Sequence, residues 1–166
     1  MTDFLMLLHR DHRDLETGLD ELLQASSVGA IRSALDGVRL GLTAHAEAED
    51  IVLHNALAAA SSDTPALLDD LVGQARSAHL AEEGALASLV SCSPHSPMWR
   101  DRVHKLRDLV HGHAFFEENH VVPAIRELAP SVYESLAGLF ATERLRQLAM
   151  LQPSAPIYLP ELARAC

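Results

Sequence analysis

Ten histidines stand out in this chain of 166 residues, and the spacing of several of them fits metal binding. Three pairs have the form His-x-x-x-Glu, which places both side chains on one face of a helix, because four residues advance about 6 Å and turn about 40°. These pairs are His45 with Glu49, His79 with Glu83, and His113 with Glu117. Imidazole and carboxylate ligands without a thiolate suit iron, manganese, zinc or copper.

Two of these pairs lie in segments that match each other in register. His113 follows His45 by 68 residues (113 minus 45), and Glu117 follows Glu49 by the same distance (117 minus 49). Both segments begin with His-Ala and carry a second acidic residue directly after the glutamate. This internal pseudo-repeat predicts equivalent ligands on two helices.

The elements that must position these residues are helices. Short stretches rich in Ser, Pro and Gly divide the chain into five segments, expected at about residues 3–25, 28–60, 66–90, 98–128 and 132–150. The first four carry apolar residues three and four apart, interrupted near the middle by histidine or glutamate. No segment alternates with the period of a strand, and Leu and Ala predominate.

This pattern predicts an all-α fold. We expect an up-down antiparallel four-helix bundle over residues 1–128. A C-terminal helix and a proline-broken tail, residues 129–166, are expected to pack on the same domain.

Polar residues on the inner face of a bundle are costly, because a buried charge is penalised by several kcal/mol unless it is paired or bound to a metal. A core with four imidazoles and two or three carboxylates has more donors than one ion needs, so the pattern predicts two ions with about one coordination position open. Glu49 and Glu117 are expected to bridge the ions. A metal-free helical interaction module is the alternative. The expected ligands are His12, His45, Glu49, His79, Glu83, His113 and Glu117.

Three further histidines are candidates for a ligand or for a supporting role. His54 lies off the inner face, about 140° from the glutamate of its helix, and reaches the metals only if that helix is bulged. His9 lies one turn before the ligand of the first helix, and we favour a hydrogen-bonding role for it. His120 lies one turn beyond the last glutamate and is expected to orient it or to line the cavity. The other three, His95, His104 and His111, are expected to face solvent.

Composition excludes several classes of protein. Twenty-three acidic residues against thirteen basic ones give a formal charge of -10, which argues against binding to nucleic-acid phosphates. The apolar runs fall short of the roughly 20 residues that span a bilayer, and two cysteines cannot form a disulfide framework. We therefore expect a cytoplasmic protein without a nucleic-acid or membrane partner. The oligomeric state is not specified by the sequence.

The motifs resemble those of the hemerythrin-like, or HHE cation-binding, family over about residues 3–128. They are Leu-His-Arg-Asp-His-Arg-Asp-Leu-Glu at 8–16, His45-x-x-x-Glu49, His79, and His113-x-x-x-Glu117-Glu118 followed by Val-Val-Pro-Ala-Ile. The resemblance implies two non-haem iron ions held between four helices. It carries over to His12, His45, Glu49, His79, His113 and Glu117.

The chain departs from the family pattern in two places. Oxygen-carrying members have a His-x-x-x-His pair on the third helix, whereas here Glu83 takes the second position. A carboxylate there favours the ferric state and weakens the case for reversible oxygen carriage. His54 stands where some members have a tyrosine near the metals.

Two functions remain open at this point. In the first, an oxo- or hydroxo-bridged diiron protein binds or reacts with peroxide, dioxygen or nitric oxide at the open position, with catalase-like peroxide disproportionation as the reaction to test. In the second, the protein senses or buffers iron, oxygen or nitric oxide without turnover.

Overall fold

Helices α1 (Phe4–Gln24) and α2 (Val28–Ala59) form the first antiparallel pair of the bundle. Asp3 caps α1, because its side chain accepts a hydrogen bond of 2.9 Å from the Leu5 N–H. Close approach of the two helices depends on small residues, since a Cβ atom at Gly41 would lie 3.1 Å from Leu15 Cδ2. The computed structural model describes residues 3–59 and 65–151.

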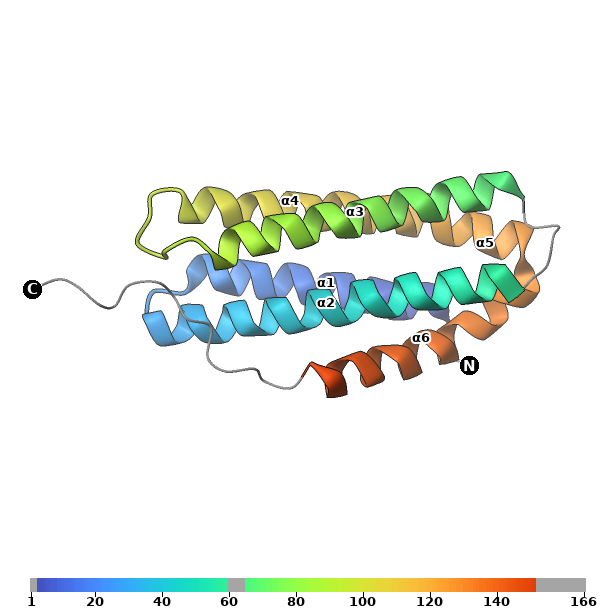
Figure 1. Cartoon of the computed structure of the whole chain (residues 1–166), viewed down its shortest axis with the longest axis horizontal. Coiled ribbons are helices and arrows are strands. Elements are labelled where there is room, and N and C mark those ends of the chain that lie inside the picture. The colour runs from blue at the N-terminus through green and yellow to red at the C-terminus, as the bar shows by residue number, and fades with distance from the viewer. Residues whose placement is uncertain (1–2, 60–64, 152–166) are drawn as a thin grey trace, which may run out of the picture.

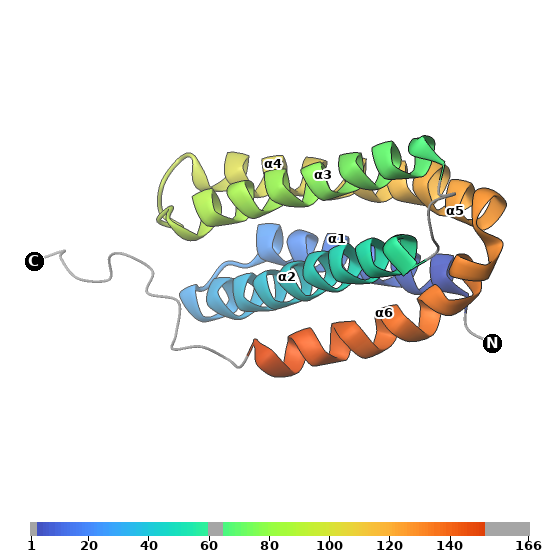
Figure 2. The same ribbon diagram turned by 45° about the vertical axis from the view of Figure 1, so that its right-hand side comes forward.

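Helices α3 (Ala66–Val90) and α4 (Trp99–Phe116) form the second antiparallel pair. After α4 come a π-helix at Glu117–Val121, α5 (Val122–Leu128) and α6 (Pro130–Met150). Figure 1 shows the two pairs side by side with α6 outside them, and Figure 2 shows the same layers after a turn of the molecule. No strand occurs in residues 3–59 and 65–151, so the predicted all-α bundle with an additional helix is confirmed.

The expected fourth helix, residues 98–128, is divided by the π-helix. The Val122 N–H bonds to the Glu117 carbonyl, five residues back rather than four. Pro123 follows, and a proline inside an α-helix removes one hydrogen bond and clashes with the carbonyl four residues earlier. A wider turn before the proline accommodates both effects. This turn begins at Glu117, one of the predicted ligands.

The apolar core consists of two clusters. One contains Leu15, Leu19, Leu42, Leu86 and Val110, among others. The other contains Phe4, Leu8, Ala48, Val52, Ala75, Val121 and Phe140, among others. Helices α1, α2 and α3 contribute buried residues to both clusters, whereas α4 contributes them to the first and the π-helix and α5 to the second. The buried histidine of each helix lies between the two contributions along the sequence. The candidate site is therefore enclosed between apolar layers.

Helix α6 packs on α1 and α2. Phe140 is buried there and its ring lies edge-on to Phe4, with centroids 5.7 Å apart. The predicted tail, from residue 152, lies outside the described residues. Among the described helices, none combines the length and the apolar character that crossing a membrane requires.

Candidate metal centre

Four histidines, one from each helix of the bundle, converge at mid-height in its interior. His12, His45, His79 and His113 are each 4% exposed or less. Two glutamates join them, and each is 1% exposed or less. These are Glu49 and Glu117. Six of the seven residues predicted as ligands thus lie together. The histidine and glutamate of α2 are one turn apart, and so are those at the boundary between α4 and the π-helix.

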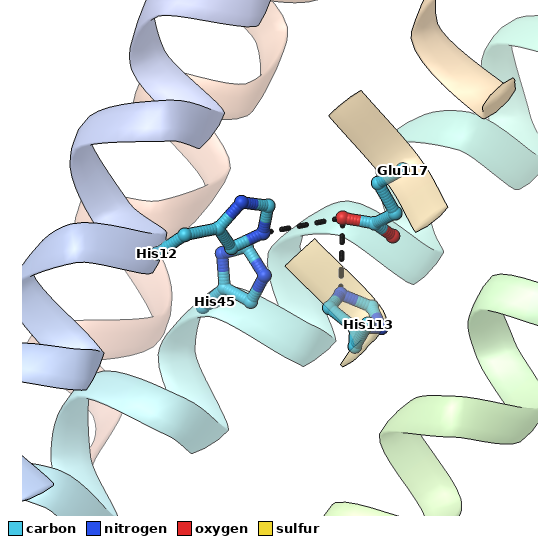
Figure 3. Close-up of side chains that lie close together, drawn as sticks. All are labelled: His12, His45, His113 and Glu117. Carbon is cyan, nitrogen blue, oxygen red and sulfur yellow. Dashed lines mark ion pairs between the residues drawn. The ribbon is translucent and has the colours of Figure 1, made fainter. Parts of the chain in front are cut away.

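The six residues form two overlapping groups of candidate ligands. One group is His12, His45, His113 and Glu117, and the other is His45, Glu49, His79 and His113. Within each group, the ligating atoms lie within 4.8 Å of one another. Figure 3 shows the first group, with the Glu117 carboxylate between the imidazoles of His12 and His113. Glu117 Oε2 lies 3.2 Å from His12 Nε2 and 3.0 Å from His113 Nε2.

The outer nitrogen of each imidazole faces a carboxylate. His12 Nδ1 lies 2.8 Å from Glu118 Oε1, and His79 Nδ1 lies 2.9 Å from Asp50 Oδ1. The remaining two distances are longer, 3.7 Å from His45 Nδ1 to Asp11 Oδ2 and 4.0 Å from His113 Nδ1 to Glu82 Oε1. Histidines that ligate a metal are commonly oriented in this way by a carboxylate on the other ring nitrogen. The arrangement directs all four Nε2 atoms to the interior.

Within the described part of the chain, the inner atoms of this cluster form no hydrogen bond, and the contacts among them are the ion pairs of Glu117 with His12 and His113 and of Glu49 with His45. The inner atoms are the Nε2 atoms of His12, His45, His79 and His113 and both carboxylate oxygens of Glu49 and Glu117. A buried polar atom without a partner costs about 1–3 kcal/mol, and a charged one costs more. Eight such atoms in one place are a poor structural core but a good donor set for cations. The residues present therefore fit a metal site.

Burial and neighbouring charges shift the pKa values of the cluster residues in opposite directions. Burial opposes the charged form of His12, yet contacts with Glu117 and Glu118 outweigh it and raise its pKa to about 9. Burial lowers the pKa of His45 to about 4. The pKa of Glu49 is raised well above its ordinary value by burial and by the neighbouring Glu117 carboxylate. Without metal, this centre holds protons on some of its ligand atoms.

The structure corrects the sequence prediction on α3. Glu82 is 1% exposed and faces the cluster, whereas Glu83 is exposed and belongs to neither group of candidate ligands. The buried residues Ala75, His79, Glu82, Leu86 and Leu89 follow spacings of four, three, four and three. The sequence alternation admitted either Glu82 or Glu83 on the inner face, and the His-x-x-x-Glu motif favoured Glu83 as the ligand.

The three supporting histidines lie outside the cluster. His9 is exposed, and its Nδ1 lies 2.9 Å from Glu118 Oε2, so it contacts the carboxylate that orients His12. His54 is exposed on α2, which runs unbroken as an α-helix past that position. His120 is exposed and packs on the Phe116 ring, because the π-helix turns it away from the interior. The histidines expected to face solvent, which are His95, His104 and His111, are all exposed.

Sequence reasoning overlooked several charged residues around the cluster. Asp11 is 2% exposed and forms an ion pair with the Arg144 guanidinium of α6. Burial opposes ionisation of Asp11, but His45 and Arg144 hold its pKa below the ordinary value. Asp50 had a visible signal, because it occupies the position in the pseudo-repeat that Glu118 occupies 68 residues later (118 minus 50). Asp11 lies within the motif at 8–16 but was given no role there, and no motif marked Arg144.

The fold and the buried cluster define a class of protein, a helical bundle with a histidine and glutamate metal-binding site in its core. The chain belongs to the hemerythrin HHE cation-binding domain family, whose model matches residues 3–125. A DNA nickase of a Nostoc species is 31% identical over 122 residues, which cover 72% of this chain and 32% of that protein. The chain therefore spans about a third of that relative. No solved structure matched the chain.

Proposed function

We propose that the cluster binds two iron ions and that the iron-loaded protein binds or reacts with a small oxidant, namely peroxide, dioxygen or nitric oxide. The observation that carries this proposal is the pair of overlapping ligand groups, which share His45 and His113. One ion would lie nearer His12 and Glu117, and the other nearer His79. The same ligands accept manganese or zinc, so elemental analysis is part of the test.

Counting donors supports an open position. Two six-coordinate ions would have about twelve positions, of which the eight inner donor atoms could fill about eight. A bridging oxygen would take about two more and would leave about two. Glu83, which the sequence count had included as a donor, lies outside the cluster, and Glu82 faces the outer nitrogen of His113. The site thus has more room for a small molecule than the sequence predicted.

When bound, the iron pair would supply electron transfer to and from the oxidant. The chain's own part is to bind the metals, to orient the imidazoles through Asp11, Asp50, Glu82 and Glu118, and to exclude water with the two apolar clusters. Metal binding would also displace the protons held by His12 and Glu49, because a ligating imidazole must be neutral at its donor nitrogen.

Oxygen evolution from peroxide tests the enzymatic form of the proposal. Peroxide disproportionation converts two molecules of hydrogen peroxide into dioxygen and two of water. We expect the iron-loaded protein to evolve oxygen and His113→Ala to lose this activity. His104→Ala is the matched control, since His104 is an exposed histidine on the same helix.

Equal rates in all three proteins would attribute the activity to free iron and would contradict an enzymatic role. Reversible changes in the optical spectrum with nitric oxide or dioxygen, without peroxide turnover, would favour a sensor or buffer. In either case the spectrum of the loaded protein should show ligand-to-metal charge-transfer bands that His113→Ala lacks.

We do not extend DNA nicking to this chain. The relative named for that activity is about three times as long as the matched region, which covers 32% of it. A formal charge of -10 opposes contact with DNA phosphates, which is usually made by clustered Lys and Arg.

A further inference from the structure

Glu83, which the sequence predicted as a ligand, and His54, a candidate for a ligand or for a supporting role, lie outside the cluster and share one pocket. His54 and Glu83 line a cavity of about 470 Å³ between α2 and α3. Each helix contributes ionisable residues three and four positions apart, and this spacing places them on one face of the helix. The α2 wall carries Glu47, Asp50 and His54, and the α3 wall carries Arg76, His79 and Glu83.

This pocket reaches the metal centre. His79, which is 4% exposed, lines it, and within the described chain its Nε2 has no hydrogen-bond partner. Asp50 lines it too and contacts His79 Nδ1 at 2.9 Å while its side chain remains 30% exposed. Three other pockets on the described surface contain none of the six cluster residues. The α2–α3 pocket therefore connects solvent with a ligand of the buried site.

The charges in the pocket favour a cation. Three carboxylates and one guanidinium, that of Arg76, line the pocket, and Arg76 Nε lies 3.8 Å from Asp50 Oδ2. Neither Glu47 nor Glu83 takes part in an ion pair with another described residue. Carboxylate oxygen and imidazole nitrogen are ligands that divalent iron, cobalt and manganese accept.

We propose that a divalent metal ion binds in this pocket on its way to the cluster, passing from Glu47, His54 and Glu83 at the surface to Asp50 and His79. The donor atoms at the surface do not form a compact group like those of the cluster, so the ion is held weakly and moves on. Arg76 opposes this passage by its charge. The inference rests on the proposed function, because it requires a metal-binding cluster.

The test measures the rate of loading separately from the final amount of metal. Anaerobic Co²⁺ is mixed with the metal-free full chain, and its ligand-field absorption is followed by stopped flow. In Glu47→Gln/Glu83→Gln we expect loading to slow by about tenfold at low salt, less at high salt, with an unchanged final stoichiometry. In Arg76→Gln we expect faster loading.

A matched control separates local from global charge. Glu127→Gln/Glu134→Gln changes the net charge equally at exposed carboxylates on α5 and α6. Equal rates in the two double variants, or slower loading in Arg76→Gln, would overturn the pocket as the route. A wild-type chain that takes up no Co²⁺ at equilibrium would instead overturn the proposed function, and this inference with it.

Discussion

Replacing Glu49 by glutamine should stabilise the metal-free protein while it weakens metal binding. Glu49 is 1% exposed, and both of its oxygens lack hydrogen-bond partners in the described structure. Its carboxylate also lies beside that of Glu117, and burial together with this neighbour raises its pKa. The side chain thus costs folding energy that only a bound cation offsets.

The size of the effect follows from the buried acceptors. An unsatisfied buried acceptor costs about 1–3 kcal/mol, and Glu49→Gln supplies an amide N–H that can donate to Glu117 without the cost of keeping a carboxyl group protonated. In a chain of this size, 1 kcal/mol shifts the Tm by about 2–4 °C. We therefore expect the metal-free variant to melt about 3–10 °C above the metal-free wild type.

Thermal unfolding with and without metal is the assay. With chelator, Glu49→Gln should melt above wild type, and with excess metal the order should reverse, because a ligand stabilises only the protein that binds it. The advantage of the variant should grow as the pH rises above 4.5, since the folded wild type retains a proton that the unfolded chain has lost. Glu47→Gln, an exposed change two residues earlier on α2, should stay within about 0.5 kcal/mol of wild type. A metal-free Glu49→Gln less stable than wild type would refute the reasoning.

Three further predictions concern the surroundings of the cluster. Arg144→Gln leaves the buried Asp11, which lies beside His45, without its cation, and should weaken metal binding by about 10–100-fold in a chelator competition. Arg144→Lys should restore part of the affinity, and unchanged affinity in Arg144→Gln would show that α6 does not support the site. Glu82→Gln should lower equilibrium metal affinity by about tenfold or more, whereas Glu83→Gln should leave it unchanged, and the opposite result in the same titration would return Glu83 to the ligand set. The stability of the metal-free protein in urea should fall as the pH rises from 6.5 through about 9, because folded His12 loses its proton there. The stability should also fall as the pH drops from 6.5 to about 4, because His45 is protonated in the unfolded chain but not in the folded one. A flat pH profile would contradict both pKa shifts.

Much of the fold and most of the site followed from the spacing of residues along helices. The candidate ligands lie one turn apart on α2 and across the boundary between α4 and the π-helix, so the same periodicity that marks the apolar face also marks the donors. The pseudo-repeat added the equivalence of His45 and His113. These features depend on local geometry, which a sequence displays directly.

The parts that could not be predicted depend on contacts between distant segments or on small local deviations. Arg144 meets Asp11 across 133 positions of the chain (144 minus 11), and no periodicity links them. Glu82 and Glu83 are adjacent, so their side chains point about 100° apart around the helix axis. A short motif does not define the facing direction of a helix closely enough to choose between them. The π-helix changed the side of the helix on which His120 lies, and only the nearby Pro123 hinted at it.

The number of metal ions per chain tests the central claim most directly. The metal-free protein would be loaded anaerobically with Fe²⁺, separated from free metal by gel filtration, and analysed for iron and protein. The account predicts about two irons per chain in wild type and a clear loss in His45→Ala, whose imidazole belongs to both ligand groups. About one iron or fewer per chain in wild type, or equal iron in both proteins, would contradict it.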